Sequence, residues 1–281
     1  MRAAAILGIG TSPNDLRAFR SDAVSFALGV PEDANGLDAI LIFGGDGTIH
    51  RHLADLVRWQ LPVLVVPRGS GNDFARSLEL SSFDHAVAAW RGFTAGANNV
   101  RAVDLGTITA FGKSQPHYFS CVAGVGLDTA TARIANGLPR WLRANGGYAL
   151  SLPLALARFT PPQVELQADG APHSAVPRVL AAFANTPWYG GGMLIAPRAD
   201  MTDGQLDACL IGEMSKARLL TLFPSVYRGK HLQFAEVEYF RGGRFRLVTQ
   251  PAVDVYADGE LVCQTPVEIG VAPRALRVIV S

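Results

Sequence analysis

Two glycine-rich segments that also carry acids hold the residues best suited to chemistry in this chain of 281 residues. Residues 44–48 read Gly-Gly-Asp-Gly-Thr and residues 69–73 read Gly-Ser-Gly-Asn-Asp, and each segment joins an apolar run to a helical pattern. Glycine lets the backbone approach a ligand closely. The N-terminus of a helix offers free N–H groups and a partial positive charge. Each junction therefore predicts a cradle for phosphate groups.

The aspartates in these segments narrow the chemistry. A carboxylate beside phosphates repels them, so Asp46 makes sense if Mg²⁺ lies between, or if it accepts a proton from a hydroxyl. Thr48 can cap the helix or bind a phosphate oxygen. Either segment alone could be an ordinary tight turn between a strand and a helix. Two of them on neighbouring parallel strands favour one shared crevice at the carboxyl edge of a sheet.

Further acids lie later in the chain. Residues 258–260 read Asp-Gly-Glu at an apparent hairpin turn, and this piece alone favours an ordinary type I′ turn. Asp200, Asp203 and Asp207 share one stretch, which suggests a solvated loop or an oxygen-ligand metal site, and the spacing alone favours the loop. Asp104 stands in an otherwise apolar strand, where a lone buried carboxylate is costly. The alternative for Asp104 is a position facing solvent.

Histidine and cysteine indicate no metal site. His50 and His52 lie two apart on an expected helix and cannot share a face, so we interpret both as surface or hydrogen-bonded core positions. The three cysteines are far apart and lack paired spacing. This argues against a disulfide scaffold or zinc knuckle and fits a reducing compartment.

Composition excludes other classes of protein. The formal net charge is +1, so no global field would attract nucleic acid, and we expect no nucleic-acid partner. Hydrophobic residues make up 49% of the chain, yet no run of roughly 18 apolar residues predicts a transmembrane helix. The apolar start is short and lacks a cleavage pattern, so we interpret it as a strand rather than a signal peptide.

The elements that position the glycine segments form an alternating pattern. Continuous apolar runs at 3–10, 39–43 and 61–67 predict parallel strands covered on both faces. Helical spacing follows the second and third runs, and 84–93 predicts another helix. Residues 1–100 therefore predict a small α/β domain.

The remainder, residues 101–281, predicts a different domain. Its many short strand candidates, with hairpin turns at Asp169-Gly170 and Asp258-Gly259, predict a mainly antiparallel β domain. A serine N-cap and a terminal glycine delimit a helix at 215–229. The fold class expected is an α/β domain followed by a β-rich domain.

In this order, the motifs resemble the catalytic domain of the diacylglycerol kinase and sphingosine kinase superfamily, in particular its small bacterial lipid kinases. "FGGDGTIHRHL" and "PRGSGNDFARSL" carry the resemblance. It continues, over nearly the whole chain, through "VRAVDLG", "CVAGVGLD", "FANTPWYGGGMLIAPRADMTDGQLDACLI", "YRGKHLQF" and "YADGELV". The resemblance implies an ATP-binding domain similar to that of phosphofructokinase, a β-rich lipid-substrate domain and a cleft between them.

The resemblance also implies site residues. The ATP site would comprise Gly44, Gly45, Asp46, Gly47, Thr48, Gly69, Ser70, Gly71, Asn72, Asp73 and Asp104. Within it, Asp46, Asp73 and Asp104 would surround a catalytic Mg²⁺. Glu260 would be the general base for the lipid hydroxyl, with Asp258 beside it, and Glu260, Asp258 and Asp46 would be the catalytic residues. A structural Mg²⁺ would bind Asp200, Asp203 and the carbonyl of Gln205.

Fewer sequence features support the lipid-binding side of the site. Residues 132–159 combine Arg133, Arg140, Arg143 and Trp141 with an apolar helical pattern, which suits docking on a membrane surface; a core helix after a polar loop fits equally well. Asp128 resembles the position where sphingosine-phosphorylating relatives recognise a head group. We expect a cytoplasmic enzyme in peripheral contact with membranes, and the sequence leaves a homodimer open.

Two features depart from the family pattern. The first strand leads into "LGIGTSPND" rather than an Asn-Pro-x-x-Gly type loop, and only about thirty residues separate it from the Gly44 loop. A trimmed strand and helix there would alter the adenine and ribose pocket. Ser70 replaces the usual threonine and keeps the hydroxyl. An NAD kinase, which shares the fold and the Gly-Gly-Asp-Gly loop, and a non-catalytic lipid-binding relative are the alternatives.

Overall fold

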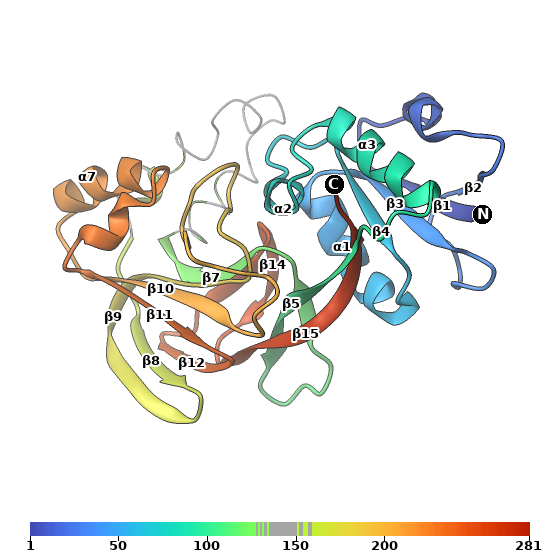
Figure 1. The fold of residues 1–281 in the computed structure, drawn as a ribbon. Helices are drawn as coiled ribbons and strands as arrows, with labels where there is room; N and C mark the ends of the chain where they lie inside the picture. Colours follow the sequence, from blue (N-terminus) through green and yellow to red (C-terminus); the bar gives the residue numbers. More distant parts are fainter. Residues whose placement is uncertain (128, 130, 132–133, 135–150, 152–153, 157–158) are drawn as a thin grey trace.

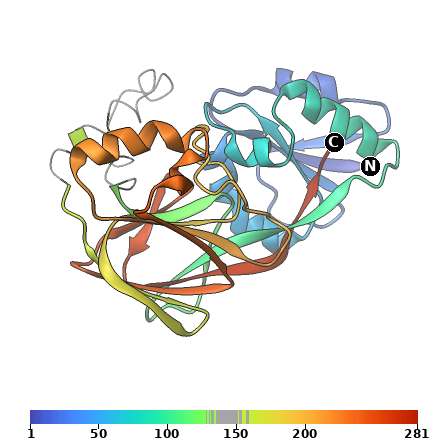
Figure 2. The ribbon, with the colours of Figure 1, turned by 60° about the vertical axis from the view of Figure 1, so that its left-hand side comes forward.

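The computed structural model describes residues 1–127, 129, 131, 134, 151, 154–156 and 159–281. The chain forms two lobes side by side (Figures 1 and 2). Asp128, Arg133, Arg140, Trp141 and Arg143 lie outside the described residues, so the roles predicted for them stay predictions. Among the helices that the structure describes, none is long and apolar enough to cross a membrane.

The first lobe is built on a parallel sheet in the order β4-β3-β1-β2. Its strands are β1 (Arg2–Leu7), β2 (Ser25–Leu28), β3 (Ala39–Gly44) and β4 (Val63–Pro67). Its helices are the 3-10 helix η1 (Pro13–Phe19), α1 (Asp46–Trp59), α2 (Asp73–Ser77) and α3 (Phe83–Thr94). Every residue of β3 and β4 is buried, as the continuous apolar runs predict.

The second lobe is an antiparallel sandwich whose two sheets share one long strand, β9 (Ala171–Ala184). Its first half pairs with β8 and its second half with β7 and β10. One sheet holds β5 (Val100–Ala110), β6 (His117–Phe119), β8 (Gln163–Ala168), β12 (Arg244–Gln250) and β15 (Val267–Ile279). The other holds β7 (Val122–Gly126), β10 (Leu206–Gly212), β11 (Val237–Gly242), β13 (Asp254–Ala257) and β14 (Glu260–Gln264). The fold class predicted from sequence is confirmed.

Local sequence signals account for several elements of this lobe. Asp169 and Gly170 have φ angles of 50° and 83°, and Asp258 and Gly259 have 50° and 84°. Two successive left-handed residues make a type I′ turn, which matches the twist of a hairpin. These turns join β8 to β9 and β13 to β14, as predicted. The predicted helix at 215–229 is α7 (Lys216–Val226), followed by η2 (Lys230–Gln233).

The two lobes are joined by more than one connection. β5 leads out of the first lobe, and β15 runs back antiparallel to it. The end of β15 then pairs in parallel with β4, through Val278 and Val63, so the C-terminus lies among the strands of the first lobe (Figure 1). The division at residue 100 stays a prediction, and the last strand belongs to both lobes. Between β1 and β3 the chain forms only η1 and the four-residue β2.

Candidate active site

The two glycine segments meet backbone to backbone. A Cβ atom placed on Gly45 would lie 2.8 Å from the Cα of Gly69, closer than real Cβ contacts come. Glycine is therefore required where the loop after β3 crosses the loop after β4. The main chain of β3 and β4 is hydrogen-bonded in register up to Gly44 and Pro67, which brings both loops to the same edge. The predicted convergence of the loops is confirmed.

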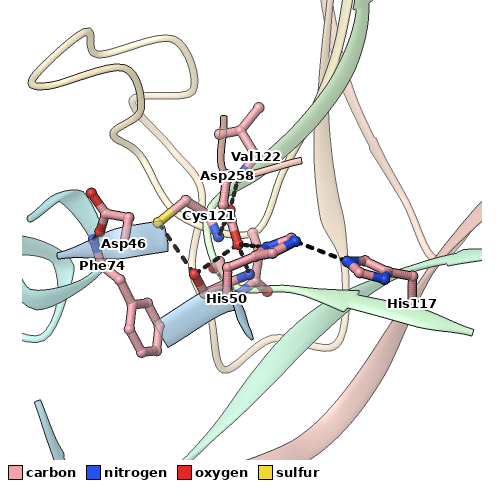
Figure 3. Close-up of polar contacts among 9 residues, drawn as sticks. Asp46, His50, Phe74, His117, Cys121, Val122 and Asp258 are labelled. Carbon is pink, nitrogen blue, oxygen red and sulfur yellow. Dashed lines mark hydrogen bonds and ion pairs between the residues drawn. The ribbon is translucent and has the colours of Figure 1, made fainter. Parts of the chain in front are cut away.

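Asp46 fastens the first loop to the second. Its Oδ2 accepts the N–H of Asp73 at 3.1 Å and its Oδ1 accepts the N–H of Phe74 at 3.0 Å, so the carboxylate caps helix α2 (Figure 3). Burial raises the pKa of Asp46, the two backbone N–H groups oppose the rise, and the negative charge of Asp258 adds to it. The net result is a pKa above the usual range.

Asp73 connects the second loop to the other lobe. Its Oδ2 accepts the N–H of Gly191 at 2.7 Å, and its Oδ1 lies 3.2 Å from Nη1 of Arg76. Gly190, Gly191 and Gly192 have φ angles of 61°, 82° and 111°, the left-handed backbone that glycine favours. Burial, and next the charge of Asp46, raise the pKa of Asp73 to about 6.

The neighbouring polar residues shape the loops. Asn72 adopts a left-handed conformation with φ 54°; its Oδ1 accepts the N–H of Gly69 at 2.8 Å and its Nδ2 donates to the Gly69 carbonyl at 2.7 Å. A Cβ atom on Gly8 would lie 2.8 Å from Oγ1 of Thr48, so that hydroxyl faces the end of β1. Ser70 is exposed. Asn72 therefore holds the turn, and the Ser70 hydroxyl is free to reach a ligand.

Glu260 comes to the first glycine loop from the second lobe. It is the first residue of β14, and its Oε1 lies 3.2 Å from the position a Cβ atom on Gly47 would occupy. Its side chain is exposed. The structure therefore places the predicted general base against the first turn of α1, beside the predicted phosphate cradle.

Asp258 lies at the centre of a network of hydrogen bonds. Its side chain is fully buried, with Oδ1 accepting the N–H groups of Cys121 (2.8 Å) and Val122 (3.3 Å). Its Oδ2 accepts the N–H (2.8 Å) and hydroxyl (3.0 Å) of Ser120 and lies 2.9 Å from Nδ1 of His50. Burial pushes its pKa upward, but His50 and these N–H groups outweigh burial and hold the pKa below the usual range. A carboxylate with so many donors orients the groups around it, and the catalytic role of Asp258 stays a prediction.

His50 and His117 are site neighbours that the sequence analysis did not identify. His50 is buried on α1, and its Nε2 lies 2.8 Å from Nε2 of His117 on β6 (Figure 3). Of the two interpretations offered for His50, the hydrogen-bonded core position is confirmed. Its place one helical turn after Asp46 was a signal that could have identified it. His117 gave no local signal, because its place depends on the pairing of β6 with β5.

Asp104 lies with different partners from those expected. Its Oδ2 accepts the N–H of Gly204 at 2.7 Å and its Oδ1 accepts the N–H of Arg274 at 2.6 Å. It is buried, so the alternative of a solvent-facing strand position is wrong. The carboxylate anchors the 200–205 loop to β5, whereas the carboxylate of Asp46 joins the two glycine loops and that of Asp73 joins the second loop to Gly191. Its participation in a catalytic magnesium network stays a prediction.

The predicted structural metal site is held by local hydrogen bonds. Asp200 accepts the N–H and the hydroxyl of Thr202, and Asp203 accepts the N–H of Gln205 at 3.0 Å. The other oxygen of Asp203 lies 3.3 Å from Nη1 of Arg241. Over the described ranges no group of three or more histidine, cysteine or acidic side chains could hold a metal. The metal role of Asp200, Asp203 and Gln205 stays a prediction.

The residues in the loops fit a magnesium nucleotide. The Gly45–Gly69 contact leaves a cradle without side chains at the N-terminus of α1. Beside it lie two acids, Asp46 and Asp73, and the negative charge of Asp46 raises the pKa of Asp73. A divalent cation relieves such like-charge repulsion, and Mg²⁺ in nucleotide sites typically uses one or two carboxylates plus the phosphates.

Comparison with known proteins agrees with this geometry. Residues 15–108 match the family described as the diacylglycerol kinase catalytic domain, and residues 121–280 match the YegS C-terminal NAD kinase beta sandwich-like domain. A diacylglycerol kinase of Mycobacterium tuberculosis is 35% identical over 252 residues, covering 88% of this chain and 78% of that protein.

Solved structures show the same fold. A crystal structure of a diacylglycerol kinase from Bacillus anthracis covers 100% of this chain and 97% of its own, with a TM-score of 0.68 and 17% identity. An NAD kinase from Archaeoglobus fulgidus in complex with ATP covers 100% of this chain and 93% of its own, with a TM-score of 0.56 and 16% identity. The fold is therefore common to both groups of kinases, and the 35% identity to the Mycobacterium tuberculosis protein is what favours the diacylglycerol kinases.

Proposed function

The chain belongs to the diacylglycerol kinase catalytic-domain family, and on that basis we propose that it transfers the γ-phosphoryl group of ATP, with Mg²⁺, to the hydroxyl of a lipid such as diacylglycerol. One observation carries the proposal: the carboxylate of Glu260 lies against Gly47, where the glycine loops form a cradle for phosphates. An acid at that place can accept the proton of an attacking hydroxyl.

The division of labour follows from the geometry. The backbone of the Gly44–Thr48 and Gly69–Asp73 loops would hold the phosphates, because these N–H groups stand at helix starts and no Cβ atoms obstruct them. Asp46 and Asp73 would hold the metal; when bound, Mg²⁺ neutralises the charge on the transferring phosphoryl group. Glu260 takes the proton from the lipid hydroxyl. Asp258 fixes the hairpin on which Glu260 stands.

We also propose that the enzyme meets its lipid through peripheral contact with a membrane. The support is the mixture of arginines, tryptophan and apolar residues in 132–159, which suits the interface of an anionic bilayer. Co-sedimentation with vesicles of anionic and of neutral lipids measures this contact. Failure to bind either kind of vesicle would contradict the proposed membrane contact.

The test of the reaction is direct. Purified protein is incubated with labelled ATP, Mg²⁺ and a total lipid extract, and the labelled product is identified. We expect one labelled phospholipid, no product in excess chelator, and a fall in kcat of about 10²–10⁴-fold for Glu260→Gln with ATP binding retained. Glu268→Gln is the matched control, because Glu268 pairs with Arg244 on the surface.

The NAD kinase alternative is resolved by the same assay. The structural likeness to an ATP-bound NAD kinase is the observation that keeps this alternative open. NAD is offered as acceptor in place of lipid, under the same conditions. Phosphorylation of NAD without labelled lipid would overturn the proposed substrate class, and ATP binding without transfer to any acceptor would favour a non-catalytic relative.

A further inference from the structure

His50 joins the two lobes at the candidate active site. It lies on α1, the helix that starts at the first glycine loop, and its ring is buried, with 7% of the residue exposed. Its Nδ1 lies 2.9 Å from Oδ2 of Asp258 on the β13–β14 hairpin, and its Nε2 lies 2.8 Å from Nε2 of His117 on β6 (Figure 3). One side chain of the first lobe thus contacts two separate segments of the second lobe.

The chemistry of these contacts fixes the orientation of the ring. An ionised carboxylate only accepts hydrogen bonds, so Nδ1 of His50 carries the proton and donates it to Asp258. At the other contact two ring nitrogens face each other, and one proton must lie between them. Either His117 donates to a neutral His50, or a doubly protonated His50 donates to His117. Both arrangements hold the His50 ring in the same plane.

Asp258 passes this constraint on to Glu260. Its carboxylate accepts backbone N–H groups of Ser120 and Cys121, which lie between β6 and β7. Its backbone is left-handed, with φ 50°, and forms the tight turn two residues before Glu260. Because a two-residue turn leaves little freedom, the direction of Glu260 depends on how Asp258 is held.

The hairpin therefore contacts one turn of α1 at two points. Glu260 contacts the turn at Gly47, and Asp258 contacts it at His50, three residues later. Residues three apart on a helix lie on the same face. Without the contact between Asp258 and His50, only the exposed side chain of Glu260 would hold the hairpin against α1.

We propose that His50 is a positioning residue for phosphoryl transfer: its Nδ1–H to Asp258 holds Glu260 at the first glycine loop, and His117 holds the His50 ring. The inference rests on the proposed function for the role of Glu260. It assigns His50 no contact with substrate, so its loss should lower kcat more than it weakens ATP binding. An asparagine in its place should keep the essential contact, since its side-chain N–H can occupy the position of Nδ1.

Steady-state kinetics of three variants test the inference. We expect His50→Ala to lower kcat about 10–100-fold, the scale set by misplacement of a catalytic group, while the Kd for ATP changes by less than about threefold. His50→Asn should stay within about threefold of the wild-type kcat, and His117→Ala should fall between the two. His52→Ala is the matched control on the same helix and should keep wild-type kcat; the 7%-exposed His50 and the half-buried His52 are two residues apart.

A crystal structure of His50→Ala supplies a readout that does not depend on activity. We expect Glu260 displaced from Gly47 in the variant and unmoved in His50→Asn. If Glu260 stays in place, or if His50→Asn loses as much kcat as His50→Ala, the inference is overturned. A wild-type chain that binds ATP but phosphorylates no lipid would refute the proposed function instead, and the two crystal structures would still decide the role of His50.

Discussion

Two neighbouring regions of this protein, the glycine loops and the β13–β14 hairpin, contain buried aspartates whose pKa values are shifted in opposite directions. In the glycine loops, burial outweighs the hydrogen bonds to Asp46 and Asp73, so both pKa values are raised. In the β13–β14 hairpin, hydrogen bonds outweigh burial, so the pKa of Asp258 is lowered. The side chains of Asp73 and Asp258 are 4% and 0% exposed, so the extent of burial does not explain the difference.

The difference lies in the partners. Asp258 receives N–H groups from Ser120, Cys121 and Val122, the Ser120 hydroxyl and a histidine. Asp73 receives the backbone N–H of Gly191 at 2.7 Å, a weaker contribution from that of Gly192 and a partly exposed arginine, and it faces the charge of Asp46. Satisfied acids hold a fold together, whereas acids short of positive partners are suited to bind a cation. The same residue type therefore holds the fold together in one region and, in the proposed function, binds the cation in the other.

The largest effect should come from the loop pair. Asp46→Ala should lower the rate of lipid phosphorylation by at least about 10³-fold, because it removes the charge proposed to bind the metal together with the cap of α2. Radiolabel transfer from ATP measures the loss, and circular dichroism checks that the fold persists. Asp55→Ala on the same helix removes only a surface pair with Arg58 and should leave the rate unchanged. Activity of Asp46→Ala within tenfold of wild type would contradict the role proposed for the two glycine loops.

The next effect should appear in stability rather than activity alone. Asp258→Ala should reduce the free energy of unfolding by about 3–5 kcal/mol, because buried N–H groups and His50 lose their acceptor. Urea denaturation at pH 7 measures the loss. Asp254→Ala, on the same hairpin, removes only an exposed contact with Gln264 and should cost less than about 1 kcal/mol. Equal losses in both variants would remove the contrast between the two regions.

A third prediction concerns pH: replacing Asp73 should stabilise the protein, whereas replacing Asp258 should destabilise it. The folded pKa of Asp73 is about 6, above the value of 3.8 usual for an exposed aspartate, so its ionisation destabilises the folded state as pH rises between these values. Asp73→Asn should therefore be more stable than wild type at pH 8, by about 1–3 kcal/mol, with the advantage vanishing near pH 4. Thermal unfolding across this range, without nucleotide or Mg²⁺, gives the comparison. A variant that is less stable at pH 8 would show that Asp73 is already satisfied.

The smallest effect should come from the 200–205 loop. Asp203→Ala removes a partly exposed pair with Arg241, so in the presence of chelator it should cost less than about 1 kcal/mol. Adding Mg²⁺ should raise the Tm of the wild type and not that of Asp203→Ala, if the metal predicted from the family resemblance binds there. A loss above 2 kcal/mol in chelator would show that the ion pair matters more than its exposure implies.

Sequence patterns predicted what depends on neighbouring residues or on simple sheet topology. The apolar runs ending at Gly44 and Pro67 fixed parallel strands, and parallel strands bring their following loops to one edge. Asp-Gly pairs fixed both type I′ turns. These features need no knowledge of distant partners, which is why they could be predicted.

Contacts across long separations could not be predicted in this way. The donors to Asp258 come from residues more than 130 positions earlier in the chain, and the partners of Asp104 lie 100 and 170 positions away, in the 200–205 loop and in β15. Which acid is satisfied depends on how the two lobes register against each other. The sequence therefore identified these acids as candidates but could not separate those with many hydrogen-bond donors from those with few.

Asp73 and Asp46 form a pair of acids with raised pKa values, and we propose that a magnesium nucleotide supplies the positive charge that they lack. Nuclear magnetic resonance of protein labelled at the aspartate carboxyl carbons tests it, with Asp73→Asn assigning the signal. We predict that the Asp73 carboxyl titrates with a pKa of about 6 in the free protein, and that ATP with Mg²⁺ moves this pKa downward. A pKa already below 4 in the free protein, or one that ATP and Mg²⁺ leave unchanged, would contradict the claim.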